Sequence, residues 1–193
     1  TGEEGPPSGV SVETNIAIPD SSVTLGFSPP QSNNNNITLR RVYRSATSDS
    51  SSGWYQVAEL AVAVSSFVDS LTDDQLGATL ATEDYLPPPS DMRGLCLMAN
   101  GIAAGFSGNT VLFSGAYLPY AWPNANRLTT EDDVVAICPA GTSLVVGTKG
   151  YPYVMTGVSP SSITSQKLNV QQACISKRSM VSVDGVVLYA SPD

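Results

Sequence analysis

The sequence of 193 residues contains no histidine. Histidine is the commonest general base in enzymes and the commonest metal ligand among the side chains. Its absence excludes a Ser-His-Asp triad and a Cys-His nucleophile. We therefore expect that the chain is not an enzyme, and that it has no catalytic residue, no bound cofactor and no metal site.

Charged residues are also scarce, at 13% of the chain, and their balance is acidic, with 17 Asp and Glu against 9 Lys and Arg. Residues 1–91 hold twelve acidic residues and three arginines (3 − 12 = −9), whereas residues 92–193 hold five acidic and six basic residues (6 − 5 = +1). An acidic balance argues against nucleic-acid binding through the phosphates. No apolar run approaches the length of about 18 residues that spans a bilayer, so we expect no membrane insertion.

Cysteine is limited to three residues, Cys96, Cys138 and Cys174, each inside an apolar run. The odd number and the absence of a Cys-x-x-Cys spacing argue against a disulfide framework and against a zinc site. We expect three unpaired and mostly buried thiols, because free cysteine behaves as a small hydrophobic residue.

Acidic residues cluster at Asp73-Asp74, Glu83-Asp84 and Glu131-Asp132-Asp133. None of these clusters has the Asp-x-Asp-x-Asp-Gly spacing of a calcium loop. Paired catalytic carboxylates, as in a glycosidase, must face each other across a cleft, which spacing alone does not show. We interpret the clusters as solvated loop acids, with calcium binding and catalysis as the weaker alternatives.

What the second half of the sequence does contain is an internal repeat. Three segments share a pattern of apolar runs separated by glycine-bearing turns: residues 94–119, 133–160 and 171–193. Asn100-Gly101 and Ala140-Gly141 are 40 residues apart, and Asp184-Gly185 follows Lys149-Gly150 by 35. A period near 40 residues with short strands is typical of β-propeller blades. We predict three stacked blades over residues 94–193, each a sheet of three or four antiparallel strands, belonging to a longer propeller.

The first half predicts short strands of a β-sandwich, because β-branched and aromatic residues alternate between polar turns. Strands are expected in five segments: Val10–Thr14, Ser22–Ser28, Ile37–Ser45, Trp54–Leu60 and Val62–Asp69. A polar turn is expected at residues 32–36. Residues 1–86 are predicted to form this module and residues 87–93, which contain three consecutive prolines, a linker.

A short helix is predicted over residues 71–80. Thr72 and Gln75 have the spacing of a capping box at its beginning.

Aromatic residues gather in one stretch between the first and second repeats. Tyr117, Tyr120 and Trp122 lie in the sequence AYLPYAWP. Large aromatic residues are enriched at the hot spots of protein interfaces and can also form platforms for sugars. We propose these three residues as candidate protein contacts, with internal packing and carbohydrate binding as the alternatives.

The stretches AYLPYAWP, QACISKRS and LYASPD, together with the IxxxRVYRS pattern upstream, permit a comparison with a family. The chain resembles tailed-bacteriophage virion structural proteins in which a fibronectin type III-like insert precedes β-propeller blades. The resemblance covers roughly residues 37–193. The fold that it implies is all-β, with an incomplete fibronectin III-like sandwich followed by a partial propeller.

The same resemblance implies a function in assembly. It implies a nozzle- or hub-type subunit of the virion tail or neck, assembled in the bacterial cytoplasm. Its partners would be copies of itself in a ring around the DNA channel and other tail proteins. The alternatives are a carbohydrate- or receptor-binding β module and, less well supported, a glycosidase propeller.

Overall fold

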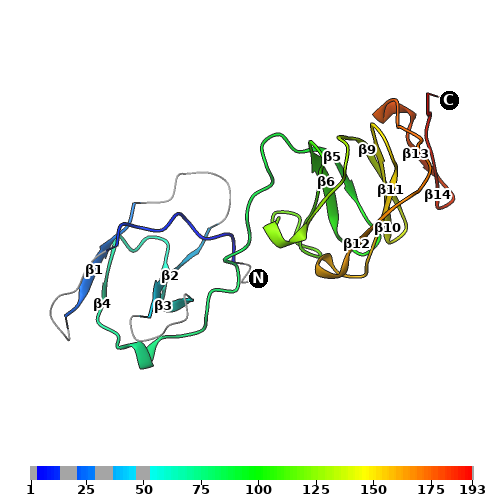
Figure 1. Cartoon of the computed structure of the whole chain (residues 1–193). Coiled ribbons are helices and arrows are strands. Elements are labelled where there is room, and N and C mark those ends of the chain that lie inside the picture. Colours follow the sequence, from blue (N-terminus) through cyan, green and yellow to red (C-terminus); the bar gives the residue numbers. More distant parts are fainter. Residues whose placement is uncertain (1–3, 14–20, 29–36, 47–52, 193) are drawn as a thin grey trace. The chain divides into compact units, whose positions relative to one another are not determined.

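The computed structural model describes residues 4–13, 21–28, 37–46 and 53–192. The fold of these residues is all-β, with small antiparallel sheets and short 3-10 helices (Figure 1). The chain divides into two compact units, residues 8–81 and residues 82–193 together with residues 1–7. The division falls between Ala81 and Thr82, just before the three consecutive prolines.

The described part of residues 8–81 contains four strands: β1 (Val23–Gly26), β2 (Leu39–Ser45), β3 (Trp54–Ala61) and β4 (Ser66–Asp69). β1 pairs with β4 and β2 pairs with β3, both antiparallel. Alternate residues of the segment around β1 are less exposed, which is the period of a strand with one covered face. These strands confirm four of the five predicted in this half.

The fifth predicted strand, Val10–Thr14, is wrong as far as the structure describes it. Residues 10–13 have no regular structure. Val10 is 73% exposed and Val12 is 90% exposed, so no neighbouring element covers the alternating side chains. Thr14 and the predicted turn at residues 32–36 lie outside the described residues.

The predicted helix over residues 71–80 is also wrong, since only the single turn η1 (Asp73–Gln75) forms. Its capping contact is present, because the amide of Thr72 donates to Oε1 of Gln75 at 3.1 Å. The following residues instead pair with β3. The amide of Gln56 donates to the Ala78 carbonyl at 3.0 Å, and the amide of Leu80 donates to the Trp54 carbonyl at 2.8 Å. Pairing with the strand edge satisfies the same backbone groups that a helix would have used.

Two four-stranded meanders dominate the second unit. The first consists of β5 (Arg93–Leu97), β6 (Ala103–Ser107), β7 (Thr110–Phe113) and β8 (Arg127–Thr129). The second consists of β9 (Val134–Ala140), β10 (Ser143–Thr148), β11 (Tyr153–Thr156) and β12 (Thr164–Lys167). In each sheet the strands pair in chain order. A single-turn helix precedes the fourth strand in both, η2 (Asn124–Asn126) and η3 (Pro160–Ser162).

The repeat seen in the sequence is therefore a repeat of structure. In the first sheet Ala104 pairs with Phe113, and in the second Val145 pairs with Val154, so both partners advance by 41 residues. Gly101 and Gly141 occupy the turns between the first and second strands with φ values of 75° and 63°. These values favour glycine, which has no side chain to strain the left-handed backbone.

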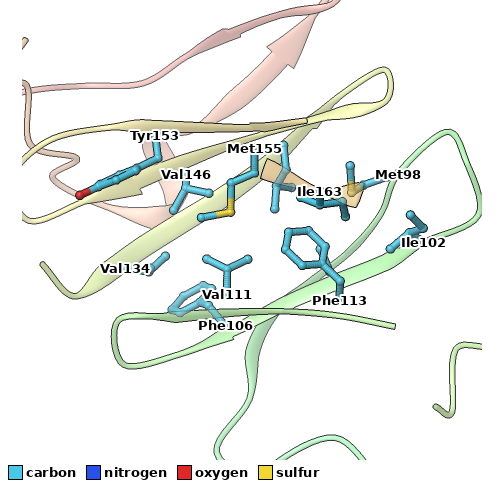
Figure 2. Packing of buried hydrophobic residues seen from close by; sticks show 12 residues of the cluster. Met98, Ile102, Phe106, Val111, Phe113, Val134, Val146, Tyr153, Met155 and Ile163 are labelled. Carbon is cyan, nitrogen blue, oxygen red and sulfur yellow. The ribbon is translucent and has the colours of Figure 1, made fainter. Parts of the chain in front are cut away.

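The main core lies between the two four-stranded sheets. Phe106, Val111 and Phe113 from the first sheet lie against side chains from the second sheet and its connections, among them Val146, Met155 and Ile163 (Figure 2). Val111, Val146 and Met155 are fully buried. The prediction of sequential antiparallel sheets packed face to face is confirmed for these two.

The third repeat forms less regular structure than predicted. After η4 (Lys177–Ser179) it contains the two-stranded hairpin β13 (Val181–Val183) and β14 (Val186–Leu188). Asp184 and Gly185 make the turn with φ values of 50° and 80°, as the Asp-Gly pair predicts. Within the described residues the sheets do not close into a barrel or a ring.

Candidate functional site

The loop between β7 and β8 carries the three aromatic residues predicted as protein contacts, and backbone hydrogen bonds hold it closed. The amide of Gly115 donates to the Ala121 carbonyl at 2.9 Å, and the amide of Ala121 donates to the Leu118 carbonyl at 3.1 Å. The amide of Trp122 reaches out of the loop to the Leu86 carbonyl at 2.8 Å. The loop is thus fixed at its base, and its side chains have defined positions.

Trp122 lies inside the protein, where it is 1% exposed. Its indole packs with Ala103, Leu112 and Met92 on the face of the first sheet that points away from the second sheet. Its Nε1 donates to the Pro119 carbonyl at 2.9 Å, which satisfies the one polar group of the ring. The indole is therefore not available as a surface contact in this structure. The indole covers the face of the first sheet that points away from the second sheet, in the space beside Ala103 and Leu112.

Tyr120 is partly buried. Its ring meets the ring of Tyr85 in an edge-to-face arrangement, with the ring centroids 6.3 Å apart and the planes at 67°. Such pairs contribute to stability beyond the area that they bury. Tyr120 therefore helps to hold residues 82–86 on the second unit.

Tyr117 is displayed at the tip of the loop with 77% of its surface exposed. Its φ of 59° lies in the left-handed region, which is costly for a bulky residue. Its amide donates to the Gly101 carbonyl at 2.9 Å. A Cβ on Gly101 would lie 2.5 Å from the Tyr117 ring, so the ring rests directly on the glycine backbone. Among the large exposed hydrophobic residues of the described chain, Tyr117 is the aromatic one.

A shallow apolar groove lies beside Tyr117. It has a volume of about 480 Å³, and seven residues line it: Leu97, Met98, Ala99, Gly101, Tyr117, Pro139 and Gly141. The amide of Ala99 donates to the Gly141 carbonyl at 3.1 Å, so the groove spans the turns of both four-stranded sheets. Leu97 was not predicted as a site residue, and it is 67% exposed in the groove.

In the acidic cluster of residues 131–133, considered above for calcium or catalysis, the first and third carboxylates form ion pairs with lysines. Nζ of Lys149 lies 2.7 Å from a carboxylate oxygen of Asp133. Lys167 pairs with Glu131, and its Nζ lies 4.0 Å from the centre of the Tyr151 ring. The hydrogen bond to Glu131 raises the pKa of Lys167 above its ordinary value. In the described residues no three His, Cys, Asp or Glu side chains are placed to hold a metal ion.

The three cysteines are free thiols, as expected, but only Cys174 is buried, and Cys96 and Cys138 are partly exposed. Burial raises the pKa of the Cys96 thiol to about 11, with a smaller contribution from nearby Cys138 and an opposing one from Lys177. Burial also raises the pKa of Cys138. At neutral pH both remain protonated, which makes them poor nucleophiles.

None of the helices in the described ranges is long and apolar enough to cross a lipid bilayer.

Comparison with known proteins does not assign the chain to a family. No family model matches it, and no curated protein matches it in sequence. Its function must therefore be argued from the geometry above.

Proposed function

We propose that this protein is a structural subunit of a tailed-bacteriophage virion, of the nozzle or hub type, which acts by assembling with other subunits. The observation that carries the proposal is the apolar surface of the last hairpin. Val181, Val183, Val186 and Leu188 are all between 50% and 60% exposed. Monomeric soluble proteins rarely leave adjacent apolar strands uncovered, and such surfaces mark interaction sites.

The packing of the preceding repeats supports this interpretation of the hairpin. The first two repeats each form a four-stranded sheet, and their facing sides bury one continuous core. The third repeat packs against the second sheet through the segment that precedes the hairpin, where a Cβ on Gly147 would lie 2.7 Å from the Cβ of Cys174. Repeated sheets of this kind gain stability from their neighbours, so the hairpin is expected to pack against a further blade or a neighbouring subunit in the assembled particle.

The strand pairing of residues 8–81 supports the fibronectin III-like part of the proposal. β1 pairs with β4 and β2 pairs with β3. In immunoglobulin-like sandwiches the second strand (B) pairs with the fifth (E), and variable-type domains add a strand after the third (C) that pairs with it. With β1 and β4 as strands B and E, and β2 and β3 as strand C and the added strand, the four strands fit this pattern as an incomplete sandwich. The partial propeller is proposed for residues 94–193 on the basis of the two stacked meanders.

The carbohydrate-binding alternative has less support. Sugar sites combine aromatic platforms with several polar side chains. The Tyr117 groove has one polar side-chain group, the Tyr117 hydroxyl, and no charged residue.

The proposal is tested by locating the protein in particles. Antibodies against the 193-residue chain are applied to purified phage particles from a host that carries this sequence, followed by electron microscopy. We expect labelling at one end of the tail or at the neck. The absence of the protein from purified particles, established by mass spectrometry, would show that the proposal is wrong.

A variant pair tests the role of the hairpin in the same particles. The double change Val183→Lys and Leu188→Lys places charges on the apolar surface and should abolish incorporation. The control is Ser182→Lys, which adds a charge at an exposed polar position of the same strand. Equal incorporation of both variants would show that the apolar surface of the hairpin is not needed for assembly.

A further inference from the structure

We propose that the groove beside Tyr117 binds the three consecutive prolines, Pro87–Pro89, of a second copy of this chain. This inference deepens the proposed assembly function and rests on it, because it specifies one contact between neighbouring subunits. It concerns a surface separate from the β13–β14 hairpin.

The groove is already formed in the single chain, so binding needs no rearrangement of its backbone. Tyr117 accepts a left-handed backbone with φ 59°, and only glycine at position 101 leaves space beneath its ring. The loop is closed by the Gly115–Ala121 hydrogen bond, so the ring is held at the surface. A fixed exposed aromatic loses little conformational entropy on binding, which is the property of a contact anchor.

The lining of the groove limits what it can bind. Leu97, Tyr117 and Pro139 provide apolar surface, and no charged side chain is among the lining residues. Phosphate groups, acidic peptides and basic peptides would lose hydration there without gaining a partner. Proline rings stack well on tyrosine, and aromatic-lined grooves are the common receptors of proline-rich segments.

The chain itself contains a suitable ligand. Pro87 and Pro88 are exposed, and residues 85–89 form no regular secondary structure. Consecutive prolines adopt the extended polyproline II conformation, which needs no ordering on binding. Hydrogen bonds fix both ends, since the Leu86 carbonyl accepts from the Trp122 amide at 2.8 Å and the Pro89 carbonyl accepts from the Met92 amide at 3.0 Å. The segment is thus a rigid projection of the same compact unit that carries the groove.

A groove on one copy and a proline segment on the next make a heterologous contact. Contacts of this type generate closed rings or filaments. One such contact is small compared with the roughly 1,200–2,000 Å² of a stable interface, so a single contact is expected to be weak. A closed ring makes many contacts at once and gains from the high effective concentration.

The test uses sedimentation of the full chain at concentrations from micromolar to about millimolar, the range in which a weak contact is populated. The wild-type chain should self-associate. Tyr117→Ala should weaken association by about 10-fold or more, as expected for a hot-spot aromatic. The double change Pro87→Ala and Pro88→Ala should do the same. The control is Val158→Ala, which shortens an exposed apolar side chain outside both the groove and the β13–β14 hairpin and should leave this association unchanged.

Mixing the two defective variants provides the sharpest result. The Tyr117→Ala chain keeps its proline segment, and the proline double variant keeps its groove. At concentrations at which neither variant associates by itself, their mixture should form a heterodimer and no larger species. A wild-type chain that stays monomeric would overturn the inference, as would a Tyr117→Ala chain that associates as strongly as the wild type, or a mixture without heterodimer. The particle-labelling result above is independent of these outcomes, so a failure here is distinguishable from a failure of the proposed function.

Discussion

Trp122 and Tyr117 lie in one loop and have opposite environments: the indole of Trp122 is 1% exposed, and the phenol ring of Tyr117 is 77% exposed. Hydrogen bonds from the loop to Leu86 and Gly101 separate the two rings. The buried residue fixes the loop, and the exposed residue is free to contact a partner. Substitutions at these two positions should therefore have different effects.

Trp122→Ala should lower the free energy of unfolding of the second unit by about 3–5 kcal/mol, the usual cost of removing a buried tryptophan. Tyr117→Ala should change it by less than about 1 kcal/mol, because an exposed side chain contributes little packing. Urea denaturation followed by circular dichroism measures both values. Similar stabilities for the two variants would contradict the burial of Trp122.

Gly147→Ala should loosen the packing of the third repeat on the second sheet. The added methyl group would lie 2.7 Å from the Cβ of Cys174 and 2.7 Å from Cε of Met180. The amide of Cys174, which donates to the Thr148 carbonyl at 2.8 Å, should lose protection from hydrogen exchange. Overpacking of this kind costs about 1–3 kcal/mol.

The control for this substitution is Gly141→Ala, where nothing lies within 4 Å of the added Cβ but φ is 63°. Its backbone strain should lower overall stability without a selective loss of protection at Cys174. Unchanged protection at Cys174 in Gly147→Ala would show that the third repeat is not packed there.

Alkylation of Cys96 should require high pH. The pKa of this thiol is raised from 9.0 to about 11, mainly by burial. Its reaction rate with iodoacetamide should rise with a midpoint near pH 11, whereas the midpoint in the unfolded chain lies near pH 9. Mass spectrometry of the Cys96 peptide separates it from the other two cysteines. A plateau below pH 9 in the folded chain would contradict the burial argument.

The same shift affects stability. Because the folded pKa of Cys96 lies above its unfolded value, the protonated thiol favours the folded state. This contribution is fully present below about pH 9 and is lost as the pH rises to about 11. Denaturation of Cys96→Ala should show a smaller decrease of stability over that interval than denaturation of the wild-type chain.

Arg44→Met should destabilise the first unit by about 1–3 kcal/mol, since it removes hydrogen bonds of a charged group. Arg44 forms ion pairs with Asp69 at 3.0 Å and Asp73 at 2.8 Å, and its Nη2 donates to the Leu71 carbonyl at 2.8 Å. These contacts join β2 to β4 and η1. Hydrogen exchange of the paired β2 and β3 amides, measured in the full chain, reports on this unit separately from the second one.

Arg41→Met is the matched control. Arg41, also in β2, pairs with Glu59 of β3 at 2.9 Å, but both side chains are about one-third exposed or more. Surface pairs contribute about 0–1 kcal/mol, so the effect should be small. An equal loss in the two variants would show that the Arg44 contacts do not link the elements.

Several elements were predictable because their signals are local. The Asp184-Gly185 pair predicts a tight hairpin turn, and β13 and β14 flank it. The glycines at 101 and 141 predict turns, and both have positive φ. The alternation around Val23 and Leu25 predicts a strand with one covered face, and β1 forms there.

Other features depended on groups distant in sequence. The capping-box spacing of Thr72 and Gln75 predicts a helix over residues 71–80, but the edge of β3 offers residues 77–80 backbone partners at Trp54 and Gln56. The groove was not predictable, because Leu97 and Pro139 come from different sheets and meet only after the sheets stack.

By itself, the sequence determined the β-rich class, the period of the repeat and its turns, because these follow from residue type and spacing along the chain. Only the tertiary structure decided that the third repeat is a hairpin with an exposed apolar surface, and that Trp122 is a core residue and Tyr117 a surface one. The physical reason is that burial depends on which surfaces meet. Ala103 and Leu112 leave a space that the Trp122 indole fills, whereas the Gly101 backbone supports the Tyr117 ring from below and leaves its other face open.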